Sequence, residues 1–252
     1  VIAFNIGSEL DDYHFQLTAS HTDSPTYKVK AVAELEGPKE YLRLNTEAYG
    51  GMIDASWFDR PLSLAGRVLV REDGKIVNKL LAIDKDILMI PNVAIHLNRE
   101  VNNGYAYNKQ IDTIPLFSVG ELKKGALDEM VASELGVKVE DLVAKDLFLV
   151  NRQRQTIWGY KDEFASSPKL DDLQCAFSSL KAFLSGDNPR AINVYAVFDN
   201  EEVGSNTKQG AMSTFLKDTL VRVNDALGFD IQDYHRAVSK SYLVSCDNAH
   251  AL

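Results

Sequence analysis

Cysteine, long apolar runs and basic clusters are all scarce in this chain. The two cysteines, Cys175 and Cys246, lie outside the paired spacings of a zinc knuckle or a disulfide framework, so we expect a reducing, cytoplasmic setting. No apolar run approaches the roughly 20 residues needed to span a bilayer, and the opening residues lack the basic flank of a signal peptide. These absences predict a soluble protein with no membrane partner.

Positive charge is also in deficit. The 27 lysines and arginines face 36 acidic residues, which gives a formal net charge of -9. Because no basic cluster offsets this excess, a polyanion would be repelled, and we predict no nucleic-acid partner. What is present is the composition of a globular protein. Of 252 residues, 45% are hydrophobic and 25% charged, which is enough for a large core and for two domains.

Three predicted strands each end next to residues that can bind a metal. The strands are residues 13–20, 192–198 and 242–246. The first alternates apolar residues at period two, and the second is apolar almost throughout, as expected of a strand buried on both faces of an α/β sheet. The candidate metal-site residues that follow the three strands are His21, Asp23, Glu201, Glu202 and Asp247.

Helical patterns separate these strands. Residues 215–227 carry an apolar stripe that ends just before Gly228. A second stripe, over residues 173–184, follows Ser167 and Pro168, which we interpret as a helix cap and the first helical position. This alternation predicts an α/β fold with a mostly parallel sheet and flanking helices, in which the site lies beyond the carboxyl ends of the strands.

The stretch from residue 28 to residue 157 has a different pattern. Strand-like segments flank Asp73-Gly74, a dipeptide typical of two-residue hairpin turns. We interpret 28–157 as a β-rich domain inserted into a catalytic domain formed by 1–27 and 158–252. Because the chain begins without Met and stops directly after a polar motif, we expect the catalytic domain to be truncated at both ends.

The positions of the candidate residues suit metal chemistry. Residues i and i+2 at a strand end project to one side, so Asp23 can accept the second N–H of a metal-bound His21. The side chains of Glu201 and Glu202 diverge, so one can bind a metal while the other faces the water that the metal activates. Asp171, in the predicted first helical turn, is favourably ionised there and can bridge two cations. Each motif alone also fits a turn, a strand end or an acid-rich helix N-terminus.

Together the motifs resemble the aspartyl aminopeptidase family of dinuclear zinc exopeptidases. In the predicted catalytic domain they are His21–Pro25, Ser167–Leu173, Asn200–Ser205 and Ser245–Ala251. The inserted stretch adds Tyr49–Gly51, Trp57–Arg60 and Ile90–Leu97. The resemblance covers essentially the whole chain.

The resemblance implies a role for each candidate residue. The zinc ligands would be His21, Asp171, Glu202 and Asp247, with Asp171 bridging two Zn²⁺ ions per subunit; Co²⁺ and Mn²⁺ are alternatives. Glu201 would be the general base, with Asp23 supporting the centre. His96 would lie in a loop that reaches toward a neighbouring subunit's active site. The family also has a further histidine ligand, which would lie beyond Leu252.

The function that the resemblance implies is removal of an N-terminal amino acid, with Asp or Glu as candidates, from peptides by a water activated at two zinc ions. The inserted domain would mediate assembly into a homo-oligomer, commonly a dodecamer in that family. Two alternatives remain open at this point. A carboxypeptidase or amide deacylase would use the same metal constellation, and a non-catalytic assembly module would follow if the truncated chain were the mature protein.

Overall fold

The computed structural model describes residues 1–250 and divides them into two compact units. The first unit joins Val1–Ser24 to the residues from Lys169 onward, and the second unit is Pro25–Pro168. The predicted insertion, 28–157, lies entirely within the second unit. Among the described residues, no helix combines the length and apolar character needed to cross a bilayer.

A four-stranded sheet lies at the centre of the first unit, in the order β1-β11-β2-β12. Its strands are β1 (Ile2–Ile6), β2 (His14–His21), β11 (Ala191–Phe198) and β12 (Tyr242–Ser245). β11 and β12 both run parallel to β2, whereas β1 runs antiparallel to β11. Only residues 7–13 connect β1 to β2, which is too short for the helical crossover that parallel strands need.

The α/β class is confirmed, whereas the predicted mostly parallel sheet holds only in part, since β11 and β12 run parallel to β2 but β1 runs antiparallel to β11. The sheet of the first unit is mixed, and the larger sheet of the second unit is antiparallel. Within the first unit, β2 lies between its two parallel neighbours. His21 pairs with Phe198 and Ala19 pairs with Ser245, so the carboxyl ends of β2, β11 and β12 meet at one edge.

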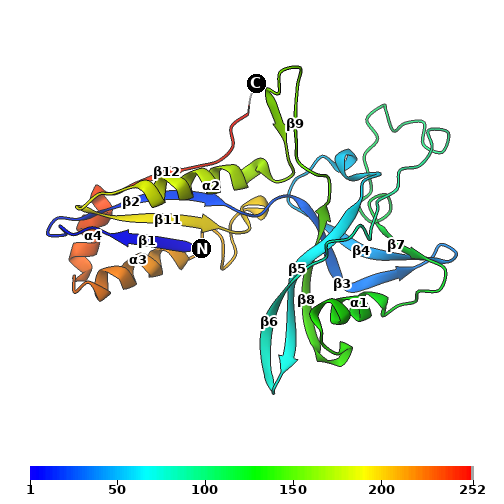
Figure 1. Cartoon of the computed structure of the whole chain (residues 1–252), viewed down its shortest axis with the longest axis horizontal. Helices are drawn as coiled ribbons and strands as arrows, with labels where there is room; N and C mark the ends of the chain where they lie inside the picture. Colours follow the sequence, from blue (N-terminus) through cyan, green and yellow to red (C-terminus); the bar gives the residue numbers. More distant parts are fainter. Residues whose placement is uncertain (251–252) are drawn as a thin grey trace. The chain divides into compact units, whose positions relative to one another are not determined.

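Helices cover both faces of this sheet (Figure 1). α2 (Leu170–Ser185) packs on one face, where Ala176 contacts Tyr195 and Val197. α3 (Phe215–Ala226) and α4 (Ile231–Lys240) pack on the other face through Leu220 and Ala237, against a core that includes Phe15 and Ile192 of the sheet. A short 3-10 helix, η3 (Glu201–Val203), follows β11.

The start of α2 differs from the prediction. Lys169, rather than Ser167, precedes the helix, and it has left-handed backbone and no side-chain cap. Asp171 and Asp172 lie inside the assigned helix but have non-helical angles, with ψ values of 115° and 26°, and a cis peptide bond joins them. The regular helix therefore starts later than the sequence suggests, and the two aspartates lie in irregular backbone.

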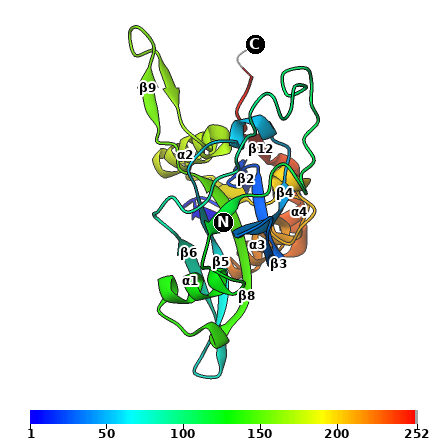
Figure 2. The same ribbon diagram turned by 90° about the vertical axis from the view of Figure 1, so that its right-hand side faces the viewer.

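A six-stranded antiparallel sheet organises the second unit, in the order β6-β5-β8-β3-β4-β7. Its strands are β3 (Thr26–Glu36), β4 (Tyr41–Tyr49), β5 (Leu62–Glu72), β6 (Lys75–Ala82), β7 (Leu116–Val119) and β8 (Leu142–Asn151). α1 (Ala126–Leu135) lies beside this sheet and packs Leu127 and Val131 into its core (Figure 2).

Smaller elements complete the second unit. They are the 3-10 helices η1 (Asp54–Trp57) and η2 (Val139–Asp141) and a two-stranded ribbon of β9 (Thr156–Trp158) and β10 (Phe164–Ser166). The hairpin predicted at Asp73-Gly74 joins β5 to β6. Both turn residues have left-handed backbone, with φ of 49° and 75°, as a type I′ turn requires.

Candidate metal centre

His21, the last residue of β2, is the central group of an acidic cluster in the first unit. It is buried, with 5% of its surface exposed. On one side of the ring, Nδ1 lies 3.0 Å from the backbone oxygen of Asp23. On the other side, Nε2 lies 3.4 Å from Asp171, 3.9 Å from Glu201 and 3.9 Å from Asp247. A proton on Nδ1 would be donated to the Asp23 carbonyl, which leaves the Nε2 lone pair facing the acids, as in a metal ligand.

The Asp23 carboxylate connects the turn after β2 to the turn after β11. It accepts the backbone N–H groups of Glu201 and Glu202, each at 3.1 Å, and its Oδ1 lies 3.3 Å from Nδ1 of His21. The sequence predicts that Asp23 supports the centre by accepting the second N–H of His21. The structure adds a second contact, because the same carboxylate holds the backbone of both glutamates.

The turn after β11 directs the two glutamates. Asn200 has left-handed backbone, with φ of 62°, a conformation that asparagine tolerates better than most residues. Gly204, also left-handed, ends η3 and donates its N–H to the Glu201 carbonyl. Burial, followed by the charge of Glu201, raises the pKa of Glu202 to about 7. The Glu201 side chain is 48% exposed, so it is accessible to solvent.

Asp171 and Asp172 point to different parts of His21. Asp171 faces the imidazole, and its pKa is raised by burial and then by the nearby charge of Asp247. Asp172 is fully buried, and its Oδ2 accepts the backbone N–H of His21 at 3.1 Å. Its Oδ1 has no hydrogen-bond partner among the residues that the structure describes. The sequence places Asp171 in a first helical turn and does not reveal that the neighbouring Asp172 is buried.

Asp247 reaches the cluster through the segment after β12. The ladder with β2 continues one residue further, because Cys246 donates its N–H to the Ala19 carbonyl at 2.7 Å. Asn248 then donates from Nδ2 to the Leu170 carbonyl at 2.6 Å. The end of β12 is therefore joined both to β2 and to the start of α2. These two connections place Asp247 and Asp171 against the same imidazole.

The donor set fits a divalent cation. Two groups of ligand atoms lie close enough to share an ion, one formed by His21, Glu201 and Glu202 and the other by His21, Asp172 and Asp247. Imidazole nitrogen and carboxylate oxygen are zinc ligands.

The charges around His21 raise its pKa. Burial alone lowers that pKa, but the negative charges of Asp172, Glu201 and Asp23 together raise it by more than burial lowers it. Concentrated negative charge around one imidazole is the environment that a cation neutralises.

The remaining histidines described by the structure lie outside these groups. His96 belongs to the second unit, where it is exposed in a turn between β6 and β7. His14 begins β2, at the opposite end of the strand from His21. His235 is exposed in α4. The role that the resemblance gives to His96 remains a prediction.

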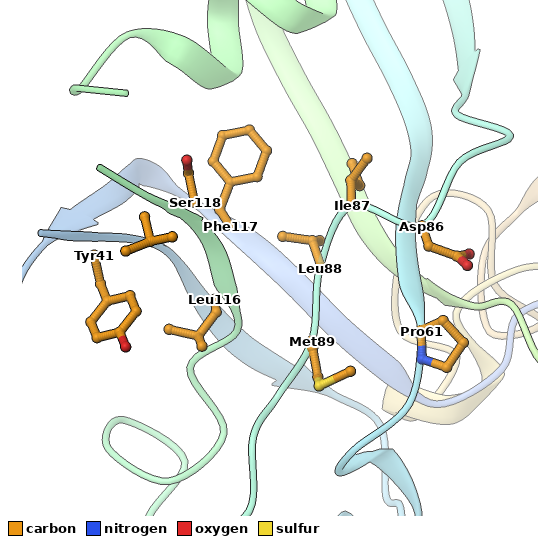
Figure 3. Close-up of a pocket in the computed structure, with 10 residues that line it drawn as sticks. Tyr41, Pro61, Asp86, Ile87, Leu88, Met89, Leu116, Phe117 and Ser118 are labelled. Atoms are coloured by element: carbon orange, nitrogen blue, oxygen red, sulfur yellow. The ribbon is translucent and has the colours of Figure 1, made fainter. Parts of the chain in front are cut away.

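The second unit carries a pocket of a different kind (Figure 3). The residues that line it are Tyr41, Pro61, Asp86, Ile87, Leu88, Met89, Leu116, Phe117, Ser118 and Val119. Its single acid, Asp86, already accepts a hydrogen bond from Arg152 at 2.6 Å. The lining contains no histidine or cysteine, so it lacks the donor set of a zinc site.

An α/β domain with imidazole and carboxylate donors beyond the ends of parallel strands has the architecture of a metalloenzyme. The aminopeptidase I zinc metalloprotease (M18) family matches residues 1–252, and the chain belongs to this family.

Curated sequence relatives carry names from the same family. A "Probable M18 family aminopeptidase 2" of Clostridium acetobutylicum is 44% identical over 258 residues, and the match covers 100% of this chain and 60% of the relative. Aspartyl aminopeptidase 1 of Schizosaccharomyces pombe is 35% identical and is matched over 100% of this chain and 59% of its own length. The chain thus spans about three fifths of the curated relatives it matches.

Solved structures show the same fold. Ape4 in its complex with Nbr1 matches with a TM-score of 0.90 and 35% identity, over 99% of this chain and 52% of that chain. The S. cerevisiae mApe1 dodecamer matches with a TM-score of 0.83 and 26% identity, over 100% of this chain and 58% of that chain.

Proposed function

We propose that the complete protein is a zinc-dependent aminopeptidase that removes the N-terminal residue, with Asp or Glu as candidates, from peptides. The observation that carries this proposal is the convergence of His21, Asp171, Glu201 and Asp247 at one edge of the sheet, in a chain of the M18 family. Two free thiols favour a cytoplasmic location.

Two zinc ions per subunit would be held by a ligand set that includes His21, Asp171, Glu202 and Asp247. The bridging ligand is Asp171 in this proposal, because its carboxylate faces Nε2 of His21 while Asp172 is hydrogen-bonded to the His21 backbone. When bound, zinc ions polarise a scissile carbonyl and lower the pKa of water. Co²⁺ or Mn²⁺ would fit the same nitrogen and oxygen ligands.

Glu201 acts as the general base in this mechanism. It accepts a proton from the attacking water and returns a proton to the leaving amine. Its exposed side chain can approach a substrate, and its Oε2 lies 3.9 Å from Nε2 of His21. Asp23 positions Glu201 by accepting its backbone N–H. The Nδ1 side of His21 also faces Asp23, which keeps the other ring nitrogen directed at the acids.

The second unit is proposed to be an inserted oligomerisation domain. The solved mApe1 relative is a dodecamer, and a homo-oligomer of this kind is our proposal for the complete protein. His96 lies exposed in a turn of this unit, where it is available to a neighbouring subunit.

Glu201→Gln tests the proposed mechanism. Removing a general base lowers the rate by about 10²-fold to 10⁴-fold, so we expect a loss of kcat in this range with zinc content unchanged. Wild-type turnover in this variant would remove Glu201 from its role. Aminoacyl anilides and N-acyl amino acids, assayed side by side, separate an aminopeptidase from a deacylase or carboxypeptidase. Hydrolysis of N-acyl substrates alone would contradict the proposal.

A further inference from the structure

The placement of Asp171 needs an explanation, because α2 does not supply it. Asp171 lies in non-helical backbone, with φ of -83° and ψ of 115°, so the hydrogen-bond ladder of the regular helix does not fix it. Its neighbours are held instead by groups from other elements. Asp172 is held by the His21 N–H at 3.1 Å, and the Asp171 carbonyl accepts from Ser24 Oγ at 3.1 Å.

The residue before Asp171 is held from the opposite side of the cluster. The Leu170 carbonyl accepts Nδ2 of Asn248 at 2.6 Å. Asn248 is the residue directly after Asp247, so this one side chain joins the backbone of the two acids that face Nε2 of His21. Asp171 and Asp247 also contact each other directly, because their carboxyls share a hydrogen bond and the charge of Asp247 raises the pKa of Asp171. The amide of Asn248 adds a link between the two backbones that does not depend on these side chains.

The amide of Asn248 has a defined orientation. Its Nδ2 must face Leu170, because a carbonyl can only accept, and its Oδ1 accepts the thiol of Cys175 at 3.3 Å. Burial, followed by a hydrogen bond with Asp172, raises the pKa of the Cys175 thiol to about 11, so the thiol keeps its proton at neutral pH and contacts both Asp172 and Asn248. Cys175 belongs to α2 after the helix has become regular, which gives the amide a firm anchor.

We propose that Asn248 is a positioning residue that sets the separation of Asp171 and Asp247 across the metal centre, and that the Cys175 thiol orients its amide. This proposal rests on the metal centre proposed above. The sequence alone gives neither Cys175 nor Asn248 a role in the site. In the structure the two side chains contact each other, and each lies near a candidate ligand in sequence. Asn248 directly follows Asp247, and Cys175 lies one helical turn after Asp171.

The test compares four variants of the complete protein: Asn248→Ala, Cys175→Ala, Cys175→Ser and Cys246→Ala. The affinity for Zn²⁺ is measured by competition with a chelator, and the melting temperature is measured after the metal has been stripped. Groups that orient metal ligands typically contribute about 10-fold to 100-fold in metal affinity. We expect a loss in this range for Asn248→Ala, a smaller loss for Cys175→Ala and recovery in Cys175→Ser, which keeps a donor.

Cys246→Ala is the matched control, since among the described residues the Cys246 thiol has one long contact, at 3.8 Å with the Val244 carbonyl, and its backbone N–H is kept. Unaltered Zn²⁺ affinity in Asn248→Ala would overturn the proposal, as would equal losses in Cys175→Ala and Cys246→Ala. Should Asn248→Ala not fold, the comparison of Cys175→Ala with Cys175→Ser decides. If the unaltered protein bound no zinc, the metal centre itself would be wrong, which is a distinct result.

Discussion

Asp23 accepts the backbone N–H of Glu202 at 3.1 Å, across 179 residues of sequence. This bond joins the loop after β2 to the loop after β11 beside the candidate metal centre. It also means that the position of a proposed zinc ligand depends on a carboxylate that need not touch the metal. Indirect support of this kind can be tested by substitution.

Asp23→Ala removes the acceptor for two backbone N–H groups. We expect Zn²⁺ affinity to fall by about 10-fold to 100-fold, because the ligand backbone loses its anchor. The measurement is chelator competition on the complete protein. Asp230→Ala is the matched control, since the Asp230 carboxylate also accepts two backbone N–H groups, at the start of α4. It should lower the free energy of unfolding by about 1 kcal/mol and leave Zn²⁺ affinity unchanged. Equal affinities in the two variants would contradict the role of Asp23.

The raised pKa of Glu202 predicts how metal binding depends on pH. A carboxyl with a pKa of about 7 still holds its proton at pH 6, so a cation must displace that proton in order to bind. Affinity for Zn²⁺ should therefore rise with pH up to about 7, and its dependence on pH should become weaker above that value. Titration calorimetry measures the Zn²⁺ affinity at a series of pH values. The series runs from about one and a half pH units below the pKa of Glu202 to about one unit above it. Proton release can be read from the buffer dependence, and a flat profile below the pKa would contradict this account.

The β5–β6 turn allows a test of the second unit. Gly74 has φ of +75°, and a Cβ atom added there would meet nothing within 4 Å, so a larger residue meets backbone strain and no steric clash. Gly74→Val should lower the free energy of unfolding by about 1–2 kcal/mol. Gly51→Val is the control, because Gly51 has the same open surroundings without a left-handed φ. Urea denaturation measures the free energy of unfolding of both variants. Equal losses in Gly74→Val and Gly51→Val would rule out the turn conformation as the cause.

His96 tests whether the second unit contributes to catalysis. If its side chain reaches a neighbouring subunit's active site, His96→Phe should reduce kcat while the zinc content stays the same. Kinetics are combined with sedimentation to separate a loss of chemistry from a loss of assembly. His235→Phe, on an exposed helix position of the first unit, is the control. Unchanged kinetics and unchanged assembly in His96→Phe would remove the proposed role.

Much of the centre can be predicted because strand ends are visible in the sequence. Apolar strands with His21, Glu201 or Asp247 within three residues of their ends indicate an edge of a sheet, and parallel strands bring such residues together. The hairpin at Asp73-Gly74 is equally predictable, since its turn chemistry is local. These features depend on patterns a few residues long.

The features that the sequence does not reveal depend on long-range contacts. The burial of Asp172 arises from a bond to the His21 backbone 151 residues away, and the Asn248 bond to Leu170 spans 78 residues. Local propensity predicts helical backbone at Asp171, in the first turn after Pro168, but these tertiary bonds hold non-helical backbone there. The sequence also does not predict that β1 is antiparallel, because the alternation of helices and strands does not determine the direction of an edge strand.

The zinc content of the complete protein tests the central claim most directly. Elemental analysis after dialysis in zinc-replete buffer should give about two ions per chain for a two-metal site. Substitution of the central imidazole, in His21→Ala, should reduce this content, whereas Asp230→Ala should not. Near-zero zinc in the unaltered protein, or a full content in His21→Ala, would contradict a metal centre built around His21.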